Sequence, residues 1–107
     1  MEKALIEITD KNYPQMLEAH PRLVIDCWAE WCRPCWMIRP TFEELASSYR
    51  GRIAFGTLDC DTNPNTVSAH RVMAIPALLL IKEGDEVDRI VGVMPKEWIE
   101  SRIKRLL

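Results

Sequence analysis

A nearly continuous apolar run at residues 22–29 constrains the fold of this chain more than any other stretch. Arg22 stands at its start, and Asp26 is the one charged residue inside it. A strand that carries apolar residues at consecutive positions must be covered on both faces, as strands inside α/β sheets are. We therefore predict a central strand here, with helices packed over both faces of its sheet.

Strand and helix patterns alternate along the rest of the chain. Further strands are predicted at residues 4–8, 53–59, 76–81 and 87–91, and helices up to residue 20 and over about 34–50, 64–71 and 95–106. Thr9 or Asp10 is expected to cap the first helix, and Pro95 to take the first position of the last. A turn at residues 83–86 makes the last two strands an antiparallel hairpin.

This order, βαβαβαββα, predicts an α/β fold with a central mixed five-stranded sheet flanked by four helices. The sequence contains no internal repeat or linker, so residues 1–107 are expected to form a single domain. With 48% apolar and 28% charged residues, the composition is that of an ordinary compact domain.

The charge and the hydropathy pattern disfavour several classes of partner. A net charge of −2 gives no long-range attraction to nucleic acid or to anionic membranes. The first residues carry charges within a short apolar run, unlike a signal peptide, and no run approaches the ~18 apolar residues of a membrane span. We therefore expect a cytoplasmic protein without nucleic-acid or membrane partners, and a monomer, since nothing implies an assembly.

A Cys-x-x-Cys pair, Cys32 and Cys35, lies between the central strand and the helix that follows it. Thiol–disulfide exchange needs one thiolate to attack a disulfide and a second thiol to resolve the mixed disulfide. The unpaired N–H groups and the dipole at a helix N-terminus lower the pKa of a thiol placed there. We therefore assign the attack to Cys32 and the resolving step to Cys35.

Two other uses of the pair were weighed, a zinc half-site and a structural disulfide. Zinc would need two more ligands, and the candidates Cys27, Cys60, His20 and His70 form no second pair at ligand spacing. A structural disulfide is disfavoured in a cytosolic protein. The pair is therefore predicted to be redox-active, with no metal. The two histidines are expected to be capping or solvated residues.

Asp26 is a candidate base because burial in an apolar strand raises the pKa of a carboxyl, which could then take the proton of Cys35. The alternative is a partly hydrated residue without a role, and Glu30 is a weaker candidate for the base. Arg33 puts a cation beside Cys32, which would favour the thiolate and make the couple more oxidising, unless its side chain points away. Cys27 is expected to be a small core residue, and Cys60 a partly exposed thiol with a regulatory, dimer-forming or packing role.

Residues 26–35 read Asp-x-Trp-Ala-x-Trp-Cys-x-Pro-Cys, and an Ile-Pro dipeptide and a glycine follow at 75–76 and 92. Together with the element order, these motifs resemble the thioredoxin family over nearly the whole chain. The resemblance implies the thioredoxin fold and a protein-disulfide reductase with Cys32 as nucleophile, Cys35 as resolving thiol and a cis bond before Pro76. The family also implies oxidised target proteins, no bound cofactor, and recharging by a separate enzyme, thioredoxin reductase.

The same resemblance implies a shallow surface on which substrate backbone docks. Its expected residues are Trp31, Arg33, Pro34, Ile75, Pro76 and Gly92. Many thioredoxins carry a lysine where this chain has Thr57, so the usual cation near the buried aspartate is expected to be absent. Two alternative functions stay open. One is a binding or scaffold subunit that keeps the fold, and the other is a more oxidising disulfide exchanger, which the cation of Arg33 beside Cys32 favours.

Overall fold

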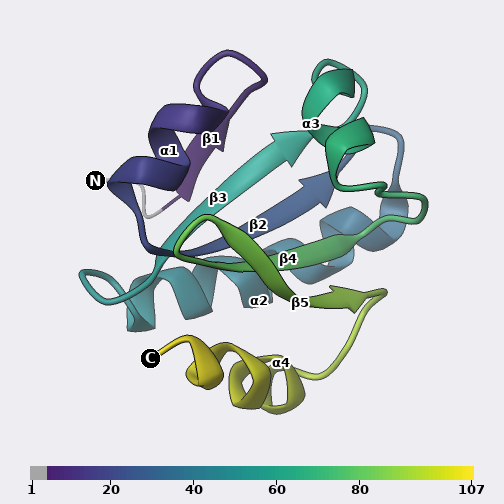
Figure 1. The fold of residues 1–107 in the computed structure, drawn as a ribbon. Coiled ribbons are helices and arrows are strands. Elements are labelled where there is room, and N and C mark those ends of the chain that lie inside the picture. Colours follow the sequence, from purple (N-terminus) through teal and green to yellow (C-terminus); the bar gives the residue numbers. More distant parts are fainter. Residues whose placement is uncertain (1–4) are drawn as a thin grey trace.

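The computed structural model describes residues 5–107, which form a mixed five-stranded sheet between two pairs of helices (Figure 1). The elements are β1 (Leu5–Ile8), α1 (Tyr13–Ala19), β2 (Arg22–Trp28), α2 (Arg33–Ser48), β3 (Ala54–Asp59), α3 (Pro64–Ala69), β4 (Ala77–Lys82), β5 (Asp85–Val91) and α4 (Lys96–Ile103), followed by a 3₁₀ turn at Lys104–Leu106. The predicted order βαβαβαββα is confirmed. Residue 4, the first of the strand predicted at 4–8, lies outside the described residues.

The strand order in the sheet is β1-β3-β2-β4-β5, so β2 is central, as its apolar sequence predicted. β1, β3 and β2 run parallel, whereas β4 is antiparallel to β2 and β5 is antiparallel to β4. Residues 23–27 are all buried. Because side chains alternate along a strand, Asp26 faces one side of the sheet and its neighbour Cys27 faces the other.

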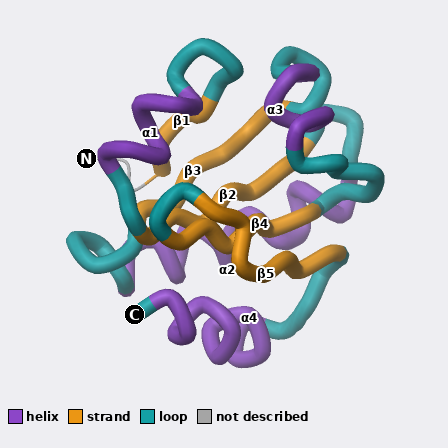
Figure 2. The backbone as a smooth tube through the Cα atoms, in the orientation of Figure 1, coloured by secondary structure: helices purple, strands orange, loops and turns teal. Residues whose placement is uncertain are grey.

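Two separate apolar clusters cover the two faces of the sheet (Figures 1 and 2). Helices α2 and α4 pack one face, where Phe42 of α2 meets Phe55 of β3 with ring centroids 5.3 Å apart. The stripe predicted for the last helix, Ile99, Ile103 and Leu106, is buried in this cluster. Helices α1 and α3 cover the opposite face, which carries Cys27.

The predicted helix caps were wrong in two places. Asn12, and neither Thr9 nor Asp10, is the N-cap of α1, and its side chain accepts a bond from the Thr9 N–H at 2.8 Å. The Asp10 carboxylate instead accepts bonds from the backbone N–H and the hydroxyl of Thr66 in α3, at 2.8 and 2.7 Å. Pro95 precedes α4 as its N-cap and is not its first helical residue.

The hairpin between β4 and β5 has a shorter turn than the sequence predicted. Only Glu83 and Gly84 form it, with φ values of 53° and 86°, and β5 already begins at Asp85. Two consecutive residues with positive φ are the backbone pattern of a two-residue hairpin turn whose twist matches that of the strands. The four-residue turn predicted at 83–86 is therefore replaced by this tighter one.

Candidate active site

Cys32 is the N-cap of α2, at the point where the chain leaves β2 and enters the helix. Its Sγ accepts a hydrogen bond from the backbone N–H of Cys35 at 3.2 Å, and the two cysteines form a disulfide with Cα atoms 5.3 Å apart. Both residues are buried, Cys35 the more deeply. The sulfur of Cys32 therefore lies at the positive end of the α2 dipole, which stabilises its thiolate once the disulfide is reduced.

The connection from β2 fixes the position of this sulfur. The backbone N–H of Cys32 donates to the Ala29 carbonyl at 3.1 Å, and this closes the turn after the strand. Pro34 occupies the first turn of α2, where a residue without an N–H leaves no helical hydrogen bond unmade. Ala29, Cys32 and Cys35 form a small buried cluster, against which Trp28 and Ile75 pack.

Three tryptophans lie close to the two cysteines in the sequence, and one of them, Trp28, packs against the buried cysteine cluster. Trp28 and Trp36 make an edge-to-face contact with ring centroids 5.2 Å apart, and the Trp36 indole N–H donates to the Glu30 carbonyl at 2.9 Å. Trp31 is 72% exposed, and its indole N–H donates to Asp61 at 3.0 Å. This bond ties the motif to the loop after β3.

Asp26 is fully buried, on the sheet face that α2 covers. Its Oδ2 accepts a bond from Nε of Arg39 at 3.1 Å, whereas its Oδ1 has no hydrogen-bond partner among the described residues. Burial raises the pKa of Asp26 to about 6, while the charge and the hydrogen bond of Arg39 act in the opposite direction. The raised pKa confirms the expectation from the apolar strand.

The cation that the family resemblance led us to look for at position 57 is absent, as expected, but Arg39 supplies a cation that the sequence reasoning did not foresee. Thr57 does lie beside Asp26 in the sheet register, but the cation comes from α2, where Arg39 stands one turn after Cys35. The Arg39 guanidinium also lies 4.9 Å from the ring centroid of Trp28, which holds it over the carboxylate. The spacing of four residues from Cys35 was the available signal, because it puts both side chains on one helix face.

The residues predicted to bind substrate fall into two groups. Ile75 packs against the two cysteines, the Ile75–Pro76 bond is cis as the family resemblance implied, and the Gly92 N–H donates to the Pro76 carbonyl at 2.9 Å. Trp31 and Arg33 line an open depression of about 540 Å³. Glu30, Trp36 and Met37 complete its lining, and of these sequence reasoning had not assigned Met37 to a surface. Pro34 is exposed in the first turn of α2.

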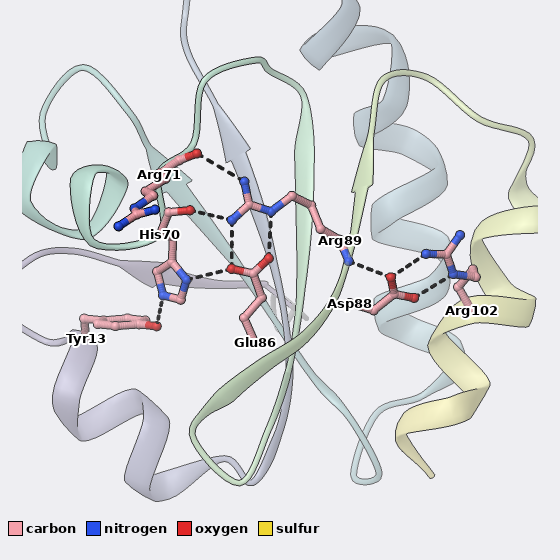
Figure 3. Close-up of polar contacts among 7 residues, drawn as sticks. All are labelled: Tyr13, His70, Arg71, Glu86, Asp88, Arg89 and Arg102. Carbon is pink, nitrogen blue, oxygen red and sulfur yellow. Dashed lines mark hydrogen bonds and ion pairs between the residues drawn. The ribbon is translucent and has the colours of Figure 1, made fainter.

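His70 belongs to a polar network on the other side of the sheet (Figure 3). It bonds the Tyr13 hydroxyl through Nε2 and pairs with Glu86 through Nδ1 at 2.9 Å, and Arg89 pairs with the same glutamate at 2.6 Å. Of the two roles expected for the histidines, the capping role is confirmed, because His20 and His70 are the C-caps of α1 and α3. The His70 side chain is not solvated, since it is only 14% exposed. The network links α1, the end of α3 and β5.

No helix within residues 5–107 is long and apolar enough to cross a membrane. 

Comparison with known proteins gives one consistent result. The sequence model of the thioredoxin family matches residues 4–105. A thioredoxin of Staphylococcus saprophyticus is 42% identical over 104 residues, which are 97% of this chain and 99% of the relative. Thioredoxins of Staphylococcus haemolyticus and Staphylococcus aureus are each 45% identical over 94 residues, 88% of this chain and 89% of the relative.

Proposed function

The chain belongs to the thioredoxin family, and from this premise we propose that it reduces protein disulfides by dithiol–disulfide exchange through Cys32 and Cys35. The observation that carries the proposal is the Cys32–Cys35 disulfide at the N-terminus of α2. Thiol–disulfide oxidoreductase activity is the chemistry of this family, and the structure holds the pair in its oxidised form.

In the reducing direction, the Cys32 thiolate attacks one sulfur of the substrate disulfide and releases the other as a thiolate. Cys35 then loses its proton and attacks Cys32, which forms the Cys32–Cys35 disulfide and releases the second substrate thiolate. The backbone N–H of Cys35 and the α2 dipole favour the charged form of Cys32, so the thiol at the helix end is the one that attacks.

Asp26 is proposed as the base that takes the Cys35 proton. Three properties support this role: the carboxyl is buried, its Oδ1 has no hydrogen-bond partner among the described residues, and its pKa of about 6 leaves it ionised near neutral pH. Arg39, whose Nε lies 3.1 Å from Oδ2, limits the rise in pKa and so acts as a positioning residue.

Docking of the substrate is proposed to use both groups of surface residues around the disulfide. Ile75 is partly exposed and packs against the cysteines, and it is followed by Pro76, which is buried and whose carbonyl accepts the bond from the Gly92 N–H. Trp31 and Arg33 line the open depression. The chain is proposed to act as a single cytoplasmic domain and as a monomer. Its proposed partners are oxidised target proteins and a thioredoxin reductase, which returns the disulfide to the dithiol.

The proposal is tested by the reduction of insulin disulfides with dithiothreitol as electron donor. The parent protein should accelerate the reaction, whereas Cys35→Ser should not complete a turnover and should accumulate a mixed disulfide with insulin. Asp26→Asn is the matched variant for the proton transfer, and it should slow the resolving step while leaving the alkylation rate of Cys32 nearly unchanged. No acceleration by the parent would overturn the reductase function and favour a scaffold role.

A further inference from the structure

Cys27 and Cys60 are the two free cysteines, and the fold brings them together on the sheet face opposite Asp26. Cys27 pairs with Leu58 in the parallel register of β2 and β3, and Cys60 follows two residues later, in the turn after β3. The Cys60 N–H donates to the Trp28 carbonyl at 2.8 Å. Both side chains join the same apolar cluster, in which the Cys60 thiol donates to the Leu58 carbonyl at 3.9 Å.

The two thiols differ in exposure and in acidity. Cys27 is completely buried beneath α1 and α3, whereas Cys60 is partly exposed. The neighbouring Cys27 thiol lowers the pKa of Cys60, although burial and the carboxylates of Asp59 and Asp61 act against this. The neighbouring Cys60 thiol and burial raise the pKa of Cys27. An oxidant from solvent therefore meets Cys60 first.

We propose that Cys27 and Cys60 form a second redox-active pair, in which Cys60 reacts with a hydroperoxide and Cys27 closes an intramolecular disulfide. The pair lies outside the Cys32–Cys35 machinery, because Asp26 and Arg39 are on the α2 side of the sheet and Cys27 faces α1 and α3. It therefore adds a modification site that the reductase function does not use.

The two steps balance as follows. The Cys60 thiolate attacks the outer oxygen of the hydroperoxide, the O–O bond breaks, and Cys60 becomes a sulfenic acid while the alkoxide takes up a proton as an alcohol or water. The Cys27 sulfur then attacks the Cys60 sulfur, an S–S bond forms, and the hydroxide leaves with the Cys27 proton as water. Two thiols are oxidised by two electrons, and one hydroperoxide is reduced.

The Cys60 thiol and burial raise the pKa of Cys27, so Cys27 enters the second step as a thiol, and Arg89 opposes this shift. Arg89, held by Glu86 and by the carbonyl of Arg71 (Figure 3), is close enough to favour the Cys27 thiolate electrostatically. Asp26 acts in the opposite direction through the sheet. The hydrogen bond from the Cys60 N–H to the Trp28 carbonyl at 2.8 Å holds the Cys60 backbone beside β2, the strand that carries Cys27.

The test uses the Cys32→Ser/Cys35→Ser protein, in which Cys27 and Cys60 are the only thiols. After treatment with hydrogen peroxide and alkylation in denaturant, intact mass should show both thiols lost without gain of oxygen. Trypsin, which cleaves poorly before proline, should release residues 23–50 linked to residues 53–71, and dithiothreitol should separate them.

Single substitutions in the same background identify the order of the steps. In Cys27→Ala, Cys60 should accumulate as a sulfenic acid that dimedone traps, whereas in Cys60→Ala the buried Cys27 should stay reduced at the same peroxide concentration. Circular dichroism checks that both variants are folded, and the double-serine protein alone decides the proposal if either is not. A Cys60 sulfinic acid beside a free Cys27, a Cys60-linked dimer, or two unreacted thiols would each overturn it.

Discussion

Replacing Asp26 by asparagine should stabilise the protein at neutral pH and abolish a specific part of the pH dependence of its stability. The folded state raises the pKa of this carboxyl from 3.8 to about 6, mainly through burial. The folded protein thus binds the Asp26 proton more tightly than the unfolded chain does. The contribution of Asp26 to the stability of the fold is therefore greatest below about pH 4 and is lost as the pH rises to about 6.

The size of the effect follows from the shift itself. A difference of about two pKa units corresponds to about 3 kcal/mol, since each unit is worth about 1.4 kcal/mol. Asparagine has nearly the same shape as aspartate and no charge to desolvate. The variant therefore lacks the free-energy cost of burying an ionised carboxylate. Its net gain at neutral pH should be below about 3 kcal/mol, because Arg39 loses its charged partner.

Urea unfolding of the oxidised parent and of Asp26→Asn, from about pH 4 to about pH 8, measures the difference directly. Subtracting the two curves cancels other titrating groups that the substitution does not touch, such as Glu86 and Asp88. Over this range the difference should change by about 2–3 kcal/mol in favour of the variant, mostly between the unfolded pKa of 3.8 and the folded pKa of about 6, with its midpoint near about pH 5. A difference that does not vary with pH would refute the reasoning that burial controls this carboxyl.

Three further substitutions test other contacts. Arg39→Met should raise the midpoint of the Asp26 titration above 6, measured from the carboxyl carbon by NMR, and an unchanged or lower midpoint would contradict the assigned role of the cation. Gly56→Ala should destabilise by about 1–3 kcal/mol in urea unfolding, because its Cβ would lie 2.4 Å from Cδ1 of Ile8. Asp10→Ala should lower the urea midpoint, since it removes the acceptor of N–H groups at the start of α3.

Much of the fold was predictable because its signals are local. The apolar run at 22–29 marked the central strand, and periodicity gave the order of the other elements. The end of the last helix followed from the stripe of Ile99, Ile103 and Leu106. The family motifs gave Cys32 and Cys35 and the cis bond before Pro76.

The errors arose where a side chain bonds to a part of the chain far away in sequence. Asp10 resembled a local cap, yet it reaches α3 more than fifty residues later. His70 follows a short helix and resembled a solvated residue, but Tyr13 and Glu86 enclose it (Figure 3). Secondary-structure propensity depends on a residue and its near neighbours in the sequence. It therefore does not predict contacts that only the tertiary fold creates.

Asp26 and Cys27 show how two thiol systems can share one strand without sharing their chemistry. The alternation of side chains sends Asp26 toward α2, where it meets Arg39, and sends Cys27 toward α1 and α3, where it meets Cys60. Backbone of the central sheet separates the two environments, and the charge of Asp26 acts across it to raise the pKa of both Cys27 and Cys60. Thr57, and no lysine, stands beside Asp26 in the sheet, and the cation that pairs with Asp26 stands on α2 instead. That arrangement makes the acidity of Asp26 depend on the same helix that carries Cys35, and a shift of α2 would change both groups together.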